Sequence, residues 1–470
     1  MQSTEFFRKL TSTFPYTATG DQLSAFKIIS DFCYCEDYRP VLIINGHAGT
    51  GKTSLLAHLS DVLESSGKPV VLMASTGRAA KVLSSFCGKT AYTVHKKIYR
   101  QKSYSDSGGT FVLNANLGNE KIFVVDEASM IQTQVQDSQV FGSGNLLYDL
   151  VEFVFSNDGC RLILSGDNAQ LPPVNETTSP ALHPPVLESL GCKVFNVNLK
   201  QITRQSLGSG ILMNATRVRT QAENRLMGDL KLTASGFPDV ERISGSDLQY
   251  AIENSYEQYG RDETVIICRS NKQAGKYNQF IRNRILFREE ALSSSDKLLV
   301  VKNNYFWLPE NDHSDFIANG DFLILRKIRR THEQHGFRFA DCLLEFTDYR
   351  LEFDALLLME SLESEGPGIT REQANQLYQS IAADYAHIKD KRKRYKEMLE
   401  DKYFNALQTK MGYAMTCHKA QGGQWKSVFV DFSFSHQEIT EPEVLRWLYT
   451  ALSRATEKLY LVNFSDRYFE

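Results

Sequence analysis

The sequence predicts an α/β protein with two parallel-sheet domains, and two observations lead to this prediction. In the first two hundred residues, apolar runs rich in β-branched residues alternate with segments of helical spacing, and a second set of such runs follows beyond residue 260. Continuous apolar strands separated by helices are typical of parallel sheets that helices cover on both faces. A chain of 470 residues also exceeds what one hydrophobic core usually organises, so we expect three or four domains.

The expected strands are short apolar runs. Those of the first set are 41–45, 69–73, 122–125, 161–164 and 193–198, and the segment from Ser54 to Leu63 has helical spacing. Those of the second set are 264–268, 427–432 and 459–463. Strands that alternate with helical segments indicate parallel pairing, so each set predicts one α/β domain.

Two segments interrupt this alternation. Residues 96–117 contain two short extended runs around a Gly-Gly turn, which predicts a β-hairpin that protrudes from the first domain. Residues 321–356 contain pieces in which apolar and polar residues alternate between turns, which predicts a small antiparallel barrel. After the barrel, Thr370 and Gln373 have the spacing of a capping box, which predicts the start of a long polar helix.

Composition and charge restrict the class of protein. The chain has 53 Lys and Arg against 56 Asp and Glu and a formal net charge of −3, which argues against a wholly basic nucleic-acid coat but leaves room for a basic groove. No apolar run approaches the length of a membrane span, and the N-terminus lacks the basic start and apolar core of a secretory signal. The eight cysteines are scattered, as in reduced proteins. We therefore expect a cytoplasmic protein.

A phosphate-binding motif lies between an expected strand and an expected helix. Its sequence is Gly46-His47-Ala48-Gly49-Thr50-Gly51-Lys52-Thr53. In this pattern the glycines let backbone N–H groups point at phosphate oxygens, and the helix N-terminus adds a favourable dipole. Lys52 would reach the β- and γ-phosphates of ATP, and the hydroxyl of Thr53 would ligate Mg²⁺.

Two adjacent carboxylates follow a buried strand downstream of this loop. The apolar run 122–125 ends in Asp126 and Glu127. We expect Asp126, at the strand tip, to hold Mg²⁺, and Glu127 to orient and deprotonate the attacking water. The sequence therefore predicts an enzyme that hydrolyses ATP and uses ATP and Mg²⁺ as cofactors.

Further motifs, in their order and spacing, resemble the helicase motifs of superfamily 1, and their details are similar to the RecD/Dda/Pif-like branch of DNA helicases. The motifs are 75–80 (STGRAA), 126–130 (DEASM), 166–174 (GDNAQLPPV), 416–422 (TCHKAQG) and 449–455 (YTALSRA). The resemblance implies two RecA-like P-loop NTPase domains with a small β-hairpin insertion, called the pin, and an SH3-like barrel plus helix insertion. The first RecA-like domain would comprise 1–95 and 119–192, the pin 96–118, the second RecA-like domain 193–324 and 409–470, and the SH3-like and helical insertion 325–408.

The resemblance also places ATP in the cleft between the two RecA-like domains. Gln22 would read the adenine edge, although Thr19 and Gln22 also have the spacing of a capping box. Gln170 would sense the γ-phosphate. Arg204 and Arg454 would act as arginine fingers from the second domain, and a structural salt bridge is the alternative for either.

The block that contains Gln421 and Gly422 also belongs to the implied nucleotide site, with Gly422 as a binding residue. Shortly after this pair, where members of the branch commonly have an acidic residue, the chain has Gln424. An uncharged amide can still accept a hydrogen bond from a ribose or from the nucleic-acid backbone. The departure therefore places nucleotide affinity or coupling at this position in question.

Single-stranded DNA would follow a track across both domains, by the same resemblance. The implied contacts are Ser75, Thr76, Arg78, Thr93, His95, Thr416 and His418. Without this resemblance, each histidine would be read as a structural residue.

The pin would add Lys97 and Tyr99 to the DNA-binding residues. The segment 96–118 holds four cations against Asp106. Tyr99, Tyr104 and Phe111 are candidates for stacking on bases, and a solvated hairpin with core-facing aromatic residues is the alternative.

Residues 389–396 (KDKRKRYK) hold six cations against one acid. Such a run is either a solvated helix face or a surface that follows DNA phosphates.

The sequence thus predicts an ATP- and Mg²⁺-dependent DNA helicase that translocates on single strands, and the branch implies 5′ to 3′ movement. The alternatives are a DNA-stimulated ATPase that translocates without unwinding, and a RecD-like subunit of a nuclease complex. As partners we expect single-stranded DNA and a duplex fork, no membrane, a monomeric chain, and proteins of DNA repair or recombination.

Overall fold

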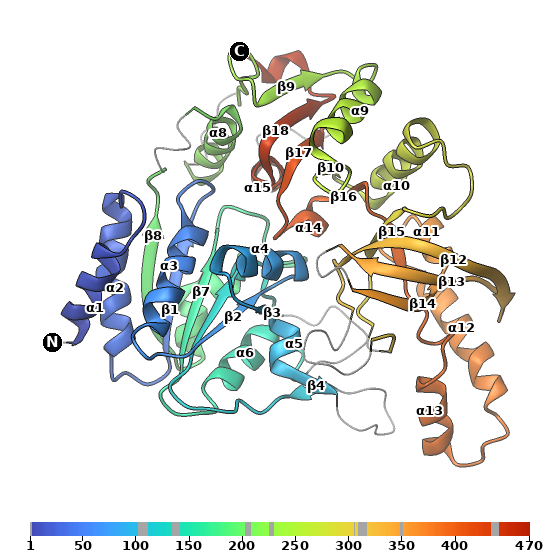
Figure 1. Cartoon of the computed structure of the whole chain (residues 1–470), viewed down its shortest axis with the longest axis horizontal. Helices are drawn as coiled ribbons and strands as arrows, with labels where there is room; N and C mark the ends of the chain where they lie inside the picture. Colours follow the sequence, from blue (N-terminus) through green and yellow to red (C-terminus); the bar gives the residue numbers. More distant parts are fainter. Residues whose placement is uncertain are drawn as a thin grey trace.

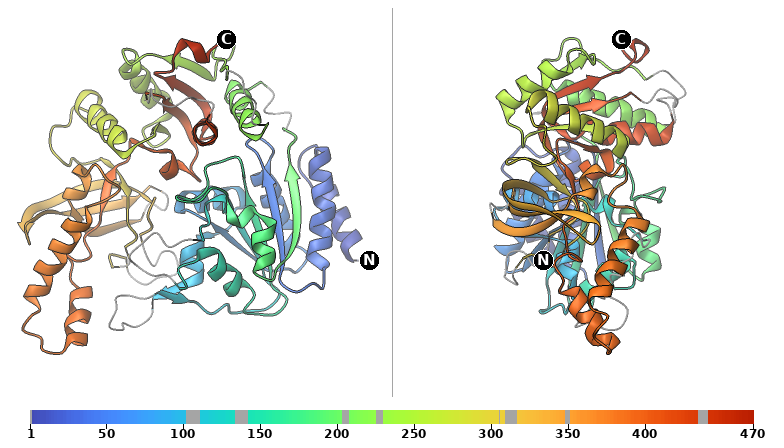
Figure 2. Two further views of the ribbon diagram at one scale, coloured as in Figure 1. Left: turned by 180° about the vertical axis from the view of Figure 1, so that it is seen from behind. Right: turned by 90° about the vertical axis from the view of Figure 1, so that its right-hand side faces the viewer.

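The structure, a computed structural model, describes residues 2–101, 111–133, 142–202, 208–224, 230–304, 306–308, 317–347, 351–433 and 441–470. The expected finger Arg204 falls outside these ranges, as do Lys102, Tyr104, Asp106 and the Gly-Gly turn of the expected hairpin. In Figure 1 the first parallel-sheet domain lies at the lower left, the second at the top, and an antiparallel sheet with its helices at the right. Figure 2 shows the same arrangement from two other sides.

The first domain is built on a six-stranded parallel sheet of order β3-β2-β6-β7-β1-β8. The strands are β1 (Pro40–Gly46), β2 (Val70–Ala74), β3 (Ala91–Thr93), β6 (Ile122–Asp126), β7 (Arg161–Gly166) and β8 (Lys193–Leu199). All five strands expected from the first set of apolar runs are present. The strand β8, which we expected to open the second domain, pairs with β1 over its whole length and is thus an edge strand of the first sheet.

Helices pack against both faces of this sheet, and their buried side chains form separate clusters on the two faces. They are α1 (Gln2–Ser12), α2 (Gly20–Tyr34), α3 (Lys52–Glu64), α4 (Gly77–Cys87), α6 (Leu146–Val154) and α7 (Pro184–Ser189). The two clusters explain the continuous apolar sequence of strands such as β1, since residues that alternate along a strand point to opposite faces. Val41 and Ile43 join one cluster, and Leu42 and Ile44 join the other.

The second domain contains a five-stranded parallel sheet of order β16-β10-β17-β18-β9. The strands are β9 (Val240–Ile243), β10 (Thr264–Cys268), β16 (Ala414–Thr416), β17 (Trp425–Asp431) and β18 (Ala455–Val462). Its helices are α8 (Gly210–Asn224), α9 (Leu248–Tyr259), α10 (Asn271–Phe280), α14 (Cys417–Ala420) and α15 (Pro442–Leu452). The three expected strands are present, while the short edge strands β9 and β16 escaped prediction.

An antiparallel sheet of order β14-β13-β12-β11-β15 extends from the second domain. Its strands are β11 (Lys297–Val300), β12 (Phe322–Gln334), β13 (Phe337–Phe346), β14 (Glu352–Leu358) and β15 (Thr409–Met411). The two edges approach each other near residue 407, because Leu407 bridges Leu357 while Thr409 pairs with Val300. The antiparallel pattern agrees with the prediction, but β11 and β15 lie outside the expected range 325–408.

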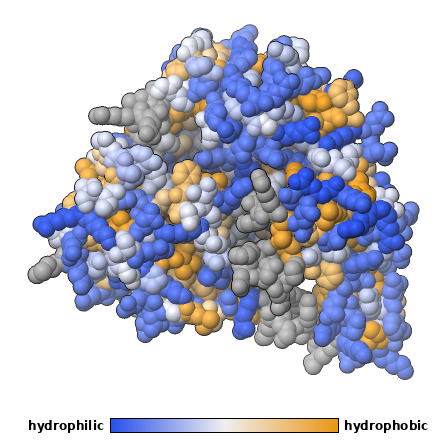
Figure 3. All heavy atoms as spheres, viewed as in Figure 1, coloured by the Kyte–Doolittle hydropathy of each residue, from blue (hydrophilic) through white to orange (hydrophobic). Residues whose placement is uncertain are grey.

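Three helices follow β14: α11 (Glu360–Glu363), α12 (Arg371–Asp384) and α13 (Lys391–Leu399). Both hydrogen bonds of the predicted capping box between Thr370 and Gln373 are present. Leu377 and Ile381 of α12 and Met398 of α13 pack against Phe339 of β13. Figure 3 shows mostly hydrophilic residues at the lower right, where Figure 1 places these helices.

The base of the expected hairpin is a two-stranded antiparallel pair, β4 (Tyr99–Gln101) with β5 (Phe111–Leu113). A short helix that the sequence did not predict, α5 (Val94–Ile98), leads into β4. Among the described residues, the helices are too short or too polar to cross a bilayer.

Candidate functional site

The phosphate loop joins β1 to α3 at the carboxyl edge of the first sheet. Gly49 and Gly51 have φ angles of 78° and 79°, a left-handed conformation that is unfavourable for other residues. The Nζ atom of Lys52 donates to the carbonyl oxygens of Gly46 at 2.5 Å and of His47 at 3.2 Å. The ammonium group is therefore held over the loop, where it can reach a bound phosphate.

The two predicted carboxylates lie at the end of β6, beside this loop. Asp126 is buried, and its Oδ1 atom accepts a hydrogen bond from the Ser165 hydroxyl at 3.0 Å. Burial raises the pKa of the Asp126 carboxyl, while the Glu127 backbone N–H and the charge of Lys52 act in the opposite direction.

Glu127 has a φ of 50°. A non-glycine residue in this conformation costs roughly 1–3 kcal/mol, and such strain concentrates at functional sites. Its Oε2 atom is buried and makes no hydrogen bond within the described part of the chain.

The second domain places Arg454 against Glu127. The guanidinium is buried, and its Nη1 atom is 4.0 Å from the Glu127 Oε1 atom. Its Nε atom donates to the Thr450 carbonyl, and its Nη1 atom donates to the Gly423 carbonyl. These two hydrogen bonds fix the orientation of the guanidinium group. Burial raises the pKa of Glu127, and the charge of Arg454 opposes this effect. The ion pair that was the structural alternative is thus present, and it joins the two domains at the predicted base.

Gln170 lies at the same interface. Its side chain is buried, and Oε1 has no hydrogen-bond partner among the described residues. The next residue, Leu171, is held from the second domain on both sides: its N–H donates to Thr450 Oγ1 at 2.9 Å, and its carbonyl accepts from Gln421 Nε2 at 2.7 Å. Because buried amide oxygens are usually paired, Gln170 is a candidate for contact with a ligand.

Two other residues predicted to contact the nucleotide have protein partners. Gln22 forms the capping box of α2 with Thr19, and its Nε2 atom donates to the Thr50 carbonyl at 3.3 Å. The structure thus shows the capping-box alternative, and the adenine contact stays a prediction. Gly422 has a φ of 72°, and a Cβ atom there would approach Thr76 Oγ1 to 2.7 Å. It therefore packs against α4 in an interdomain contact.

Comparisons with known proteins support the predicted resemblance. Residues 33–225 match the AAA domain family, and residues 411–462 match the UvrD-like helicase C-terminal domain family. The chain is similar to the ATP-dependent RecD2 DNA helicase of Deinococcus radiodurans (29% identical over 37% of this chain and 21% of that protein) and to the ATP-dependent DNA helicase dda of Enterobacteria phage T4 (29% identical over 57% of each chain). These matches confirm the predicted resemblance to the superfamily 1 helicases of the RecD/Dda/Pif-like branch.

The chain thus spans about a fifth of the RecD2 protein and just over half of the phage protein. The chain also aligns with a solved structure of two Pif1 helicases that concerns DNA unwinding at forked double-stranded DNA. The alignment covers 97% of this chain and 94% of that chain, at 14% identity and a TM-score of 0.49.

Several residues expected on the DNA track begin helices. Thr76 accepts a hydrogen bond from Ala79 N at the start of α4, and Thr93 does so from Lys96 N at the start of α5. Thr416 precedes α14, and His418 is exposed on that helix. The helix starts bring backbone N–H groups close to these side chains, and N–H groups and hydroxyls are common phosphate ligands.

Two other residues of the expected track lie in the first domain. Burial lowers the pKa of His95 to about 4, so that side chain is neutral at pH 7. Ser75 donates to the sulfur of Met130 at 3.4 Å. Neither residue therefore offers a positive charge to a DNA phosphate.

Arg78 joins the two domains. Its guanidinium lies 4.2 Å from the centroid of the Trp425 ring, and Nη2 donates to the Gln424 carbonyl at 2.6 Å. The contact at Gln424 is thus made by its backbone carbonyl, which the identity of its side chain does not predict. In this conformation Arg78 serves an interdomain contact, and DNA contact at this position remains a prediction.

The aromatic residues at the base of the expected hairpin are core residues, which was the alternative for Tyr99 and Phe111, and their stacking on bases stays a prediction. Tyr99 is 7% exposed and Phe111 is 6% exposed. The Tyr99 hydroxyl donates to Asp149 Oδ2 at 2.7 Å. Lys97, in contrast, lies 4.9 Å from the Tyr92 ring centroid, and burial lowers the pKa of its ammonium group.

Replacing Tyr99 with Phe should therefore reduce stability and leave DNA affinity unchanged. The change removes a hydrogen bond from the buried Asp149 carboxylate, at a cost of about 1–3 kcal/mol. Chemical denaturation measures the stability, and fluorescence anisotropy with single-stranded DNA measures the affinity. Weaker DNA binding at unaltered stability would instead show that the Tyr99 hydroxyl contacts DNA.

Proposed function

We propose that the chain is an ATP-dependent DNA helicase that translocates 5′ to 3′ on single-stranded DNA and couples ATP hydrolysis in the interdomain cleft to strand separation. The observation that carries this proposal is the approach of Arg454, from the second domain, to Glu127 beside the phosphate loop. A site completed by two domains works only when the domains are correctly placed, so hydrolysis can drive their relative movement.

In the proposed reaction, Lys52 binds the β- and γ-phosphates, Glu127 accepts a proton from the attacking water, and Gln170 contacts the γ-phosphate. Mg²⁺, when bound, supplies positive charge to the phosphates, and Thr53 and Asp126 would hold it. The residues fit this ion: Asp126 is a carboxylate beside the loop, and the Thr53 hydroxyl makes no hydrogen bond within the described residues. Both oxygen types are ligands that Mg²⁺ prefers.

The proposed parts of the motor follow the sheets. The two parallel-sheet domains would be RecA-like, with the first extending to Leu199, and the pair β4–β5 would be the base of the pin. The antiparallel sheet, including β11 and β15, would be the SH3-like insertion, extended by α12 and α13. The sheet order and the approach of its edges near residue 407 support this last assignment.

Strand separation on 5′-tailed and 3′-tailed duplexes, with ATP hydrolysis measured alongside, tests the proposal. We expect unwinding of the 5′-tailed duplex. Unwinding of the 3′-tailed duplex alone would contradict the polarity. DNA-stimulated hydrolysis without unwinding would favour a translocase, and neither activity would favour a subunit that needs a partner.

The basic helix α13 supplies a further prediction. Lys393 and Lys396 are exposed and make no ion pair within the described residues. Replacing both with Gln should lower the slope of log affinity against log salt by roughly 2 for duplex DNA, if each lysine neutralises one phosphate. The matched control replaces with Gln the exposed Arg8 of α1 and Lys27 of α2. These two helices lie on the opposite side of the molecule from α13 in Figure 1. Equal slopes for both pairs would identify α13 as a solvated face.

A further inference from the structure

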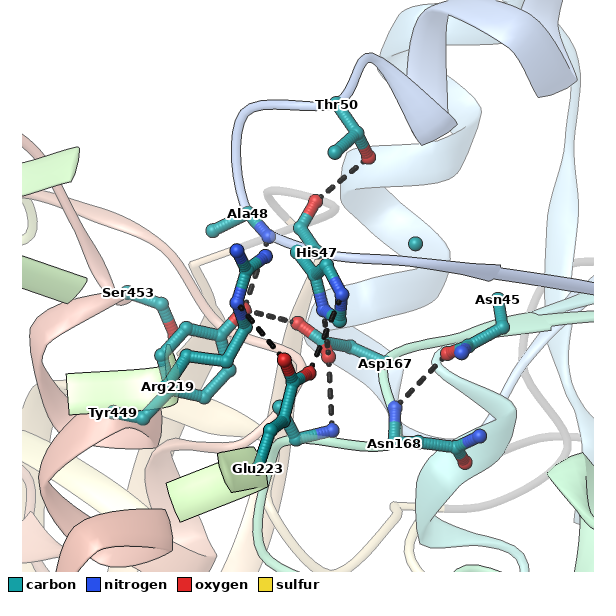
Figure 4. A network of polar contacts seen from close by, with 12 residues as sticks. Asn45, His47, Ala48, Thr50, Asp167, Asn168, Arg219, Glu223, Tyr449 and Ser453 are labelled. Atoms are coloured by element: carbon teal, nitrogen blue, oxygen red, sulfur yellow. Dashed lines mark hydrogen bonds and ion pairs between the residues drawn. The ribbon is translucent and has the colours of Figure 1, made fainter. Parts of the chain in front are cut away.

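The hydroxyl of Tyr449 connects the two domains through hydrogen bonds. Tyr449 lies in α15 of the second domain, and its ring is 1% exposed. Its hydroxyl donates to Asp167 Oδ2 and accepts a hydrogen bond from the backbone N–H of Ala48, at 3.1 Å. Figure 4 shows Tyr449 reaching from its helix toward the phosphate loop. One oxygen atom therefore contacts both the loop and the turn that follows β7.

Asp167, the acceptor of the Tyr449 hydroxyl, is completely buried and has further partners. Its Oδ1 atom lies 3.3 Å from His47 Nδ1, in the phosphate loop, and accepts from Ala169 N at 3.0 Å. Burial would raise the pKa of Asp167, but the His47 hydrogen bond, the charge of Lys52 and the Tyr449 hydroxyl outweigh it, and the pKa is lowered. Asp167 is thus an ionised acceptor at neutral pH.

Two charged residues of α8, in the second domain, add ion pairs to these contacts around His47. Glu223 Oε1 lies 3.5 Å from His47 Nε2, and the Arg219 Nε atom lies 3.9 Å from Glu223 Oε2. Both ring nitrogens of His47 therefore face carboxylates, one in each domain. The loop is connected to the second domain through Tyr449 and again through α8 (Figure 4).

Hydrogen bonds connect the segments that contact the Tyr449 hydroxyl to candidate catalytic groups. The Asp167 carbonyl accepts a hydrogen bond from the N–H of Gln170, so the position of Asp167 determines that of Gln170. The His47 carbonyl accepts from Lys52 Nζ. On the side of α15, Arg454 donates to the carbonyl of Thr450, the residue after Tyr449. A displacement of the hydroxyl would thus reach Lys52, Gln170 and Arg454 through one or two hydrogen bonds.

We propose that Tyr449 is a positioning residue for ATP hydrolysis: its hydroxyl fixes the phosphate loop and the Gln170 turn relative to α15, so that Arg454 is aligned with both. This inference rests on the proposed ATPase function. The residue touches no reacting atom in this role. It acts by keeping the groups of two domains in one geometry, and a displacement of about 1 Å at such a site can cost about a hundredfold in rate.

The test is the variant Tyr449→Phe, which keeps the buried ring and removes only the hydroxyl. We expect DNA-stimulated kcat to fall by about tenfold to a hundredfold, while the KM for ATP and the affinity for single-stranded DNA stay within about twofold, since the residue acts on geometry and not on binding. The matched control is Tyr460→Phe, a buried tyrosine of β18 whose ring stacks on Phe429. All assays are run well below the melting temperatures of both variants.

A double-mutant cycle with Asp167→Asn separates positioning from general loss of stability. If the hydroxyl acts through Asp167, Tyr449→Phe should reduce kcat far less in the Asp167→Asn chain than in the parent. Parental kcat in Tyr449→Phe, a rise in KM alone, or equal losses in both backgrounds would each overturn the inference. An inactive parental chain would instead overturn the proposed function, so the two failures are distinguishable.

Discussion

The Glu127→Gln variant is expected to bind ATP and to hydrolyse it about a thousand times more slowly than the parental chain, which lies within the range for loss of a general base. The amide has nearly the same shape as the carboxylate but cannot accept the proton of the attacking water. Single-turnover ATP hydrolysis and binding of a fluorescent ATP analogue measure the two effects. Single-stranded DNA binding should be retained.

The companion variant Lys52→Ala should also lose turnover, but with weaker nucleotide binding, because the ammonium contacts the phosphates directly. If Glu127→Gln retained normal turnover, Glu127 would not be the base. If it lost nucleotide binding to the same degree as Lys52→Ala, the carboxylate would act in binding and not in the chemical step.

The pH dependence of the parental enzyme offers an independent check on Glu127. A general base works only in its deprotonated form, so turnover falls as the pH decreases through the pKa of the base. Burial raises that pKa above the ordinary value of a glutamate. The acid limb of kcat should therefore lie at higher pH than for an exposed carboxylate, and it should disappear from the residual rate of Glu127→Gln.

Local sequence patterns predicted the parts of the fold that local physics determines. The strand β1 lies buried between two layers of helices, so its residues 40–44 are all apolar, and the run is visible without knowledge of its neighbours. The phosphate loop is equally visible, since its glycines, lysine and threonine are consecutive. The strand β8 was predicted, but its pairing with β1 was not. This pairing depends on tertiary structure, and it places β8 in the first sheet.

The contacts that the sequence did not predict are those between residues far apart along the chain. Tyr99 is buried and donates to Asp149, and Arg78 lies over the Trp425 ring of the second domain. Neither pairing has a signal in the spacing of residues. Tyr449 stands within a recognised motif, yet its contacts with Ala48 and Asp167 depend on how two domains meet. Sequence reasoning therefore located the site but not the connections that align it.

Removal of the Arg454 guanidinium is expected to have an effect at least as large as removal of the base. An arginine finger contributes roughly 10³ to 10⁵ in turnover, so Arg454→Ala should reduce kcat by about a thousandfold or more. Arg454→Lys should restore little, because an ammonium cannot reproduce the planar fork that donates to both Thr450 and Gly423. The matched control is Arg446→Ala, in α15, the helix that precedes Arg454, which removes an interdomain hydrogen bond to the Thr177 carbonyl at 2.7 Å.

The same variant separates the two roles that Arg454 can have, because its charge opposes the effect of burial on the pKa of Glu127. Without the charge, that pKa should rise further, and the acid limb of the residual turnover should move to higher pH. An arginine that acts only as a structural ion pair would produce the pH shift and lose little rate once the pH is high enough to deprotonate Glu127. A finger would leave turnover low at every pH. Measuring kcat from acidic to alkaline pH thus decides whether Arg454 stabilises the base or also the transferring phosphoryl group, and a full recovery at high pH would exclude the second role.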